Sequence, residues 1–158
     1  MLARSVLAAA LMVAAVRASA QDYTPRPRVQ VEGRVDATSA RTSSLVAMAG
    51  ANVPLGIYVR LGLAGGGGVS WHDGVTGTAG RADLTVRYLL DPFAEFARGY
   101  YAGGGLTVRA DDERRAGLLL VFGVEGRPHG GYRMAAEAGL GEGVRVAFVL
   151  RRARANSR

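Results

Sequence analysis

The residues best able to support a reaction lie in one short stretch, Ser70-Trp71-His72-Asp73. A serine nucleophile needs a base within hydrogen-bond reach and a third group that orients the base, an arrangement that supports acyl transfer. Ser70 and His72 are two positions apart and would share one face of an extended strand, whereas Asp73 would join them only if the chain turned. Because a motif without its structural context is weak, we interpret the stretch as part of a glycine-rich loop and predict no catalytic residue.

Metal and cofactor chemistry has even fewer candidate residues. The chain has no cysteine and only two histidines, His72 and His129. The acidic run 111–113 could attract Ca²⁺, but two arginines follow it directly. The glycine-rich segments 65–68 and 103–105 lack the Gly-Lys-Ser/Thr element of a phosphate-binding loop. We therefore predict no metal site and no cofactor-binding site.

The N-terminal segment is typical of a secretory signal peptide. Arg4 supplies the positive charge, residues 5–16 form a short apolar run, and Ala18-Ser19-Ala20 has the small-residue pattern of a cleavage site. The run is too short to span about 30 Å of hydrocarbon, which argues against an uncleaved anchor. We predict that residues 1–20 are a signal peptide cleaved after Ala20 and that residues 21–27 form a short linker.

The chain is basic, with a formal net charge of +7 at pH 7, and every basic residue is arginine. A basic balance can indicate nucleic-acid binding, but an exported protein seldom meets nucleic acid. Alanine, glycine, valine and arginine dominate the composition, as a GC-rich genome would dictate, so codon bias and a solvated surface account for much of the arginine. We expect no nucleic-acid partner and regard anionic lipid headgroups as the more natural contact for the excess charge.

Alternation with a period of two dominates the rest of the chain and predicts an all-β fold. Residues 28–37 place small or apolar side chains at odd positions and polar side chains at even positions. The pattern recurs and gives eight expected strands, at residues 28–37, 45–51, 55–64, 81–89, 100–110, 118–127, 132–140 and 144–152. Their lengths suit membrane-spanning β-strands, which need about 9–11 residues, and the smallest membrane barrels have eight. Only residues 91–98 are ambiguous between helix and loop.

We predict an eight-stranded antiparallel up-and-down β-barrel over residues 28–152, followed by a basic C-terminal tail at 153–158. The connections are glycine-rich, and the longest is expected at residues 65–80. If the N-terminus is periplasmic, that connection is extracellular, where such barrels keep their longer loops.

Periodicity alone does not say which face is outside, but three features favour a barrel in a membrane. Opposite charges recur on the polar face, where an inward position would let Arg34, Arg60, Arg87, Arg109 and Arg145 meet Glu32, Asp83, Glu125 and Glu137. Tyr88, Tyr100 and Tyr132 fall on the apolar face at one end, like half of an aromatic girdle. Glycines at 103–105 would leave room for an arginine crossing a narrow lumen.

The chain resembles the small eight-stranded outer-membrane barrels over residues 28–152. It also resembles uncharacterised exported proteins of GC-rich bacteria that carry Asp91-Pro92-Phe93 followed by Tyr100-Tyr101-Ala102-Gly103-Gly104-Gly105-Leu106. The barrel likeness is architectural and carries over no functional residue. The chain departs from many such barrels by continuing past its last strand rather than ending on an aromatic residue.

The resemblance implies the barrel fold and an outer-membrane location. Because we predict no catalytic residue, we expect a non-enzymatic barrel with a membrane-structural or surface-interaction role and with the lipid bilayer as its partner. Two alternatives stay open from the sequence. One is a soluble periplasmic barrel that binds a small apolar ligand. The other is a lipid-modifying outer-membrane enzyme centred on His72.

Overall fold

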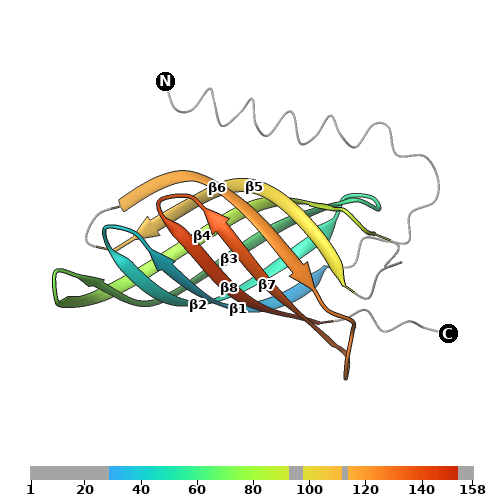
Figure 1. Ribbon diagram of the computed structural model, residues 1–158, viewed down its shortest axis with the longest axis horizontal. Coiled ribbons are helices and arrows are strands. Elements are labelled where there is room, and N and C mark those ends of the chain that lie inside the picture. Colours follow the sequence, from blue (N-terminus) through green and yellow to red (C-terminus); the bar gives the residue numbers. More distant parts are fainter. Residues whose placement is uncertain (1–28, 93–97, 112–113, 153–158) are drawn as a thin grey trace.

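The chain folds as a closed barrel of eight strands in a computed structural model, which describes residues 29–92, 98–111 and 114–152 (Figure 1). The expected eight-stranded antiparallel up-and-down barrel is therefore confirmed. The strands are β1 Gln30–Ser39, β2 Ser43–Pro54, β3 Val59–His72, β4 Val75–Leu89, β5 Gly99–Ala110, β6 Arg114–Glu125, β7 Tyr132–Leu140 and β8 Val144–Arg152. No helix in the described part of the chain is long and apolar enough to cross a membrane.

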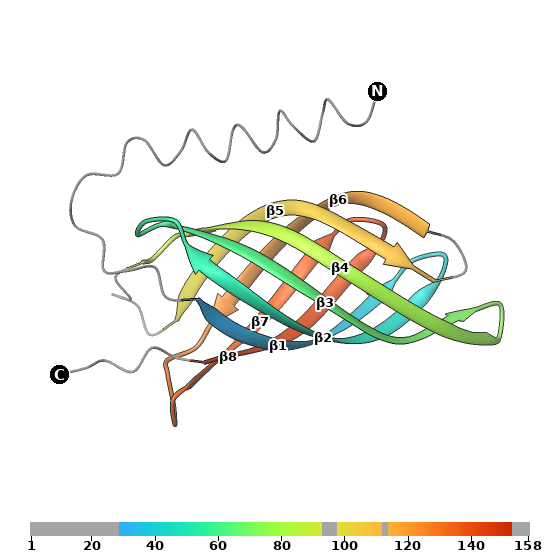
Figure 2. The same cartoon turned by 180° about the vertical axis from the view of Figure 1, so that it is seen from behind.

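Each strand pairs with its neighbours in sequence, and the first strand closes the barrel by pairing with the last. The β1–β8 seam joins Val35 to Phe148 and Ser39 to Val144 in antiparallel register. Seen from behind, β1 and β8 lie side by side like any other pair of strands (Figure 2). Closure leaves no edge strand along the wall, which removes the unpaired backbone groups that an open sheet exposes.

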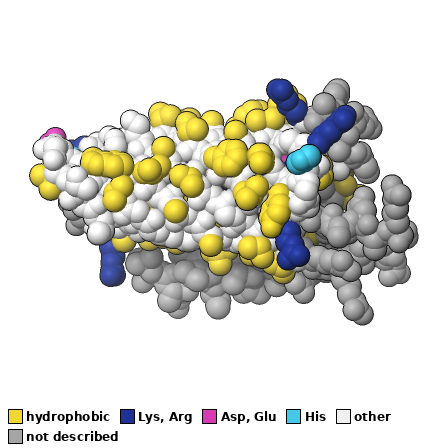
Figure 3. All heavy atoms as spheres, turned by 90° about the horizontal axis from the view of Figure 1, so that it is seen from below, with side chains coloured by type: hydrophobic (Ala, Val, Ile, Leu, Met, Phe, Trp, Pro, Cys, Tyr) yellow, Lys and Arg dark blue, Asp and Glu magenta, His cyan; other side chains and the backbone are white. Residues whose placement is uncertain are grey.

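The two faces of the wall have opposite chemistry, and the polar face is inside. Along β8 the side chains alternate between exposed and buried, so Arg145 and Arg151 point inward while Val146, Phe148 and Leu150 point outward. The same alternation holds for β1, where Asp36 is 0 % exposed and Val35 is 48 % exposed. Figure 3 shows hydrophobic side chains spread along the wall, with basic side chains gathered toward its two ends. This arrangement suits a hydrocarbon environment, because outside a membrane the apolar outer face would be exposed to water.

The predicted long loop at residues 65–80 is wrong, because this segment forms most of the β3–β4 hairpin. Gly65 and Gly67 pair with Ala49 and Ala47 of β2, and the turn between the strands contains only Asp73 and Gly74. Glycine has no side chain, so a run of four glycines hides the alternation that marks a strand. The expected strand at 55–64 also begins late, since residues 55–58 form a turn and β3 starts at Val59.

The mid-strand glycines of β5 serve a different purpose from the one predicted. A Cβ atom at Gly103 or Gly105 would overlap the backbone carbonyl oxygen of Val86 or Leu84 on β4, rather than an arginine side chain. Glycine is thus needed where β4 and β5 approach closely in the strongly curved wall. The expected relation between glycine and arginine occurs instead at Gly62 of β3, where a Cβ would lie 2.8 Å from Nη1 of Arg87.

The two ends of the barrel differ in their connections. The end that carries the β1–β2, β3–β4, β5–β6 and β7–β8 turns, which we call the hairpin end, has only short turns between strands. The β3–β4 hairpin projects beyond its neighbours at this end, on the left of Figure 1. The other end, which we call the terminus end, carries the start of β1, the end of β8 and the longer connections 90–98 and 126–131. The longest connection was predicted at the hairpin end, whereas the longer connections lie at the terminus end. The ambiguous segment at 91–98 falls largely outside the described residues.

Candidate functional site

The interior of the barrel is filled by ion pairs, and Glu137 of β7 lies at their centre. Its carboxylate accepts hydrogen bonds from Arg34 at 2.5 Å, Arg151 at 3.0 Å and the Tyr101 hydroxyl at 2.7 Å. The guanidinium group of Arg87 lies 3.3 Å from the same carboxylate. These partners come from β1, β8, β5 and β4, so the Glu137 carboxylate connects strands on opposite sides of the lumen.

Arg151 of β8 extends this network toward the terminus end. Its guanidinium group donates hydrogen bonds to Glu32 at 2.8 Å and Glu125 at 2.6 Å, in addition to Glu137. It also lies 5.1 Å from the centroid of the Tyr101 ring, within range of a cation–π interaction. One arginine therefore contacts three carboxylates, and its five N–H donors in a rigid planar fork suit that arrangement.

Arg145 of β8 extends the network toward the hairpin end. It donates hydrogen bonds to Asp36 at 2.6 Å and to Asp83 at 2.8 Å. Asp83 also accepts from Arg81 at 2.9 Å and from the hydroxyl of Thr107 at 2.7 Å. Buried charges are tolerated when each has several partners of this kind, because desolvation is then offset by hydrogen bonds.

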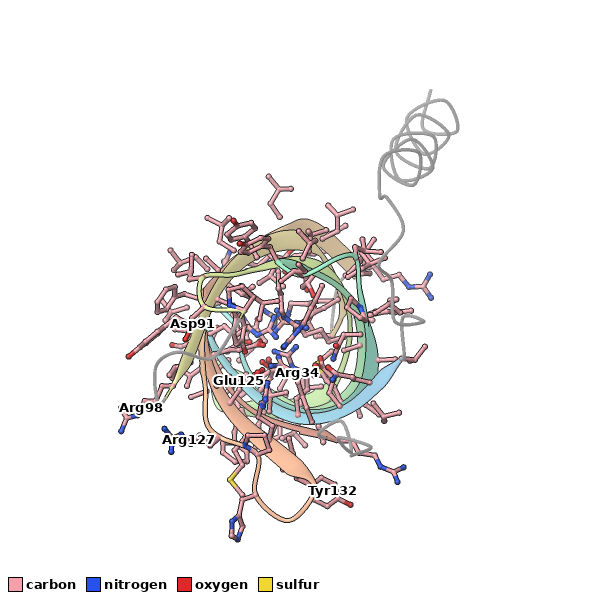
Figure 4. The ribbon with its side chains drawn as sticks, turned by 90° about the vertical axis from the view of Figure 1, so that its right-hand side faces the viewer. Arg34, Asp91, Arg98, Glu125, Arg127 and Tyr132 are labelled. Carbon is pink, nitrogen blue, oxygen red and sulfur yellow. The ribbon has the colours of Figure 1, made fainter. Side chains whose placement is uncertain are left out.

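The filled interior leaves little space for passage or binding. A small cavity of about 30 Å³ lies at the hairpin-end mouth, between Arg41, Arg109 and Glu142. A cavity of that size has room for about one or two water molecules and not for a ligand. Eight-stranded barrels have an interior just wide enough for side chains, and here charged side chains occupy it (Figure 4).

Most of the predicted interior charges meet as expected. Glu32, Asp83, Glu125 and Glu137 all point inward, and four of the five predicted arginines, Arg34, Arg60, Arg87 and Arg145, pair with them. Arg109 is the exception, because it pairs with Asp111 at 2.9 Å and lies 4.0 Å from Glu142 near the hairpin end.

Four charged residues and one tyrosine of the network were not among the predicted set. Asp36, Arg81, Arg151 and Tyr101 are buried, and the partly exposed Arg133 pairs with Glu125. Each occupies a position of the polar face in the alternating pattern, so the period-two signal that marked the others also applies to them. Tyr101 directly follows Tyr100 in the sequence, but the two side chains lie on opposite faces of β5. Tyr100 points outward and Tyr101 points into the lumen.

The stretch with potential for acyl transfer is not assembled as a triad. The Ser70 hydroxyl donates to the carbonyl oxygen of Thr78 across the β3–β4 hairpin at 3.4 Å. His72 places Nδ1 3.0 Å from the carbonyl oxygen of Arg41 and Nε2 3.3 Å from Asp73. The two histidines, His72 and His129, lie at opposite ends of the barrel. Among the described residues, no three histidine, aspartate or glutamate side chains gather as metal ligands would.

Replacing Tyr101 by phenylalanine tests the polar network without changing its packing. The ring would still lie against Gly123 and under Arg151, but the hydroxyl that bonds Glu137 and Arg151 would be lost. Hydrogen bonds to charged groups contribute about 1.5–3 kcal/mol. We expect Tyr101→Phe to lower the free energy of unfolding by that amount in urea titrations of the lipid-embedded protein. Tyr100→Phe, which changes an exposed ring on the outer wall, should leave it unchanged, and equal values for the two variants would contradict the assignment.

The outer wall carries an apolar belt with tyrosines at one edge. Leu63, Leu84 and Leu106 are cross-strand partners on β3, β4 and β5, and they are 62 %, 44 % and 55 % exposed. Four exposed tyrosines lie at the terminus end of the belt, at Tyr58, Tyr88, Tyr100 and Tyr132. The rings of Tyr58 and Tyr88 stack with centroids 5.6 Å apart. The predicted positions of Tyr88, Tyr100 and Tyr132 are confirmed, and they match the interfacial tyrosines of membrane barrels.

Comparison with known proteins supports the architecture and not a closer relationship. No protein-family model and no curated protein matches the sequence. Neisserial surface protein A aligns with a TM-score of 0.59 and 12 % identity, over 80 % of this chain and 96 % of that protein. The N-terminal β-barrel domain of OprF from Pseudomonas aeruginosa aligns with a TM-score of 0.56 and 15 % identity, over 78 % of this chain and 93 % of that domain. A de novo designed transmembrane β-barrel aligns with a TM-score of 0.53 and 14 % identity, over 84 % of this chain and 98 % of the design. The chain thus has the fold of small eight-stranded outer-membrane barrels.

Proposed function

We propose that this protein is a non-enzymatic barrel that spans the outer membrane and has a structural role there. The observation that carries the proposal is the inverted wall, with apolar side chains outside and a continuous ion-pair network inside. Outward-facing leucine, valine and phenylalanine side chains stabilise the barrel in hydrocarbon and destabilise it in water. The lipid bilayer is the partner, and anionic headgroups are the expected contact for the excess of arginine.

A structural role is favoured over a surface-interaction role by the shape of the hairpin end. The turns there are short, so only the β3–β4 hairpin offers much surface beyond the belt among the described residues. The interior also gives no support to transport, because charged side chains close it along its length.

The two alternatives have weaker support. A soluble carrier of an apolar ligand needs apolar side chains inside, whereas the largest fully buried side chain is that of Arg145. A lipid-modifying enzyme needs Ser70 and His72 within hydrogen-bond reach, and each of them is bonded to a different backbone carbonyl group.

Export and location are tested together by expressing the full chain in a Gram-negative host. We expect the mature protein to begin at Gln21, as the Ala18-Ser19-Ala20 pattern predicts, and to fractionate with outer membranes. Mass spectrometry of the separated membranes reads both results. Recovery of a folded chain from the soluble periplasmic fraction, without detergent, would overturn the proposal. A retained Met1 would refute only the cleavage.

A further inference from the structure

The two rims of the barrel differ in charge, and the difference points to a lipid-binding surface. At the terminus end, the part of the chain that the structure describes has three exposed arginines, Arg98, Arg127 and Arg152, at or just beyond the ends of β5, β6 and β8. Figure 4 shows Arg98, Arg127 and Tyr132 pointing away from the barrel, whereas Arg34 and Glu125 point into it. Among the described residues, these outward arginines form no ion pair with the carboxylates of the interior network.

The register brings arginines and tyrosines of this rim together. Arg152 is the cross-strand partner of Tyr132, and both side chains are exposed on the outer wall. Arg98 precedes Gly99, which pairs with Glu125, and Arg127 follows Glu125 by two positions. Arg98 and Arg127 therefore leave the rim from adjacent strand ends. We call Arg98, Arg127, Arg152, Tyr100 and Tyr132 the collar.

The hairpin end has a different balance. Its exposed arginines among the described residues, Arg41, Arg114 and Arg115, share that end with three acidic residues, Asp73, Asp111 and Glu142. At the terminus rim, Asp91 is the single acidic residue outside the lumen among those that the structure describes. An anion approaching the collar thus meets less repulsion than one approaching the hairpin end.

We propose that the collar binds the phosphate groups of anionic phospholipids, so that the barrel prefers a leaflet rich in such lipids at its terminus end. Arginine forms paired N–H···O bonds to phosphate oxygens, and tyrosine rings lie at headgroup level beside them. Arginine at a membrane surface strengthens binding to anionic lipid severalfold for each side chain. This inference rests on the proposed membrane location and adds the lipid class and the rim that recognises it.

The test compares folding of the mature chain in vesicles of phosphatidylcholine and in vesicles of phosphatidylcholine mixed with phosphatidylglycerol. Urea titration in each vesicle gives a folding equilibrium constant, and the ratio of the two constants measures the preference for anionic lipid. We expect the wild-type ratio to exceed one and to fall by about tenfold or more in Arg127→Gln/Arg152→Gln. The matched pair Arg41→Gln/Arg114→Gln, which removes equal charge at the hairpin end, should change the ratio by less than about threefold.

Each result has a distinct meaning. A wild-type ratio near one, or an equal loss in both double variants, would overturn the collar and leave the membrane barrel intact. Failure of the wild type to enter either vesicle, together with folding in buffer, would instead refute the proposed function. If the collar pair fails to fold, Arg127→Gln alone decides, because Arg127 lies outside the strands and its loss cannot disturb the wall. An unchanged ratio in that single variant would then overturn the inference.

Discussion

Replacing Glu137 by glutamine should lower the free energy of unfolding by about 3–5 kcal/mol, the usual cost of breaking a buried ion pair by removing one partner. Glutamine keeps the size and shape of the side chain, so the loss comes from charge. Arg34, Arg87 and Arg151 all lie within 3.3 Å of the Glu137 carboxylate, and none of them can shed its proton. Their mutual repulsion would then be left without its central counter-charge.

The measurement is urea unfolding of the refolded protein in lipid vesicles, with the midpoint and slope recorded separately. We expect the midpoint to fall and the slope to stay constant, because the buried area is unchanged. Glu142→Gln is the control, since that carboxylate lies 4.0 Å from Arg109 with 21 % of its side chain exposed. A separation of 4.0 Å is too long for a direct hydrogen bond, so we expect this substitution to cost about 1 kcal/mol or less. If Glu137→Gln costs no more than Glu142→Gln, the interior charges do not hold the wall together.

Introducing arginine at Leu84 should cost about 2–4 kcal/mol if the belt faces hydrocarbon. Leu84 precedes Tyr88 by four residues on the same face of β4, which places it roughly 10 Å from the tyrosine edge along a tilted strand. An apolar band about 25 Å tall has its midplane near that depth. A guanidinium group there would be far from headgroups and water.

Thr76→Arg is the matched control, because Thr76 lies on the same strand and on the same outward face as Leu84. Thr76 is the second residue of β4, near the tip of the projecting hairpin, and its side chain is exposed. Near the interface the cost of arginine falls to about 0–1 kcal/mol. Equal costs at the two positions would mean that the wall faces a uniform environment, and a wild-type chain that folds without detergent would lead to the same conclusion.

The strands and their faces could be predicted because side-chain alternation is a local property. Strand β7 was predicted to the residue at Tyr132–Leu140, and β8 at Val144–Arg152, since valine, phenylalanine and leucine alternate there with arginine and glutamate. The prediction failed where side chains are absent, in the glycines of β3. Curvature of the wall, which requires glycine at Gly105 against the Leu84 carbonyl group, is not encoded in a hydropathy pattern.

The partners of the interior charges could be predicted only as a group. Which carboxylate contacts which arginine depends on the heights of the two residues along the barrel. Those heights are set by the registers of all the strand pairs that lie between them. Asp36 illustrates this, because it bonds its near neighbour Arg34 at 2.9 Å and Arg145 of β8 at 2.6 Å. The first contact is local, whereas the second exists only because β1 and β8 close the barrel. Arg109 was misassigned for the same reason, since its height on β5 sets it beside Asp111.

The pairing of β1 with β8 also determines what the chain exposes to water before it inserts into a bilayer. Every strand needs two neighbours, and the first and last strands find theirs only in each other. A chain released from a secretion channel therefore exposes apolar side chains and unpaired strand edges until β8 is available to pair with β1. In water it cannot bury these apolar side chains, because the interior of the barrel is filled by charged groups. We expect such a chain to depend on chaperones during transit. We expect a version shortened by one strand at either end to aggregate rather than insert into the membrane.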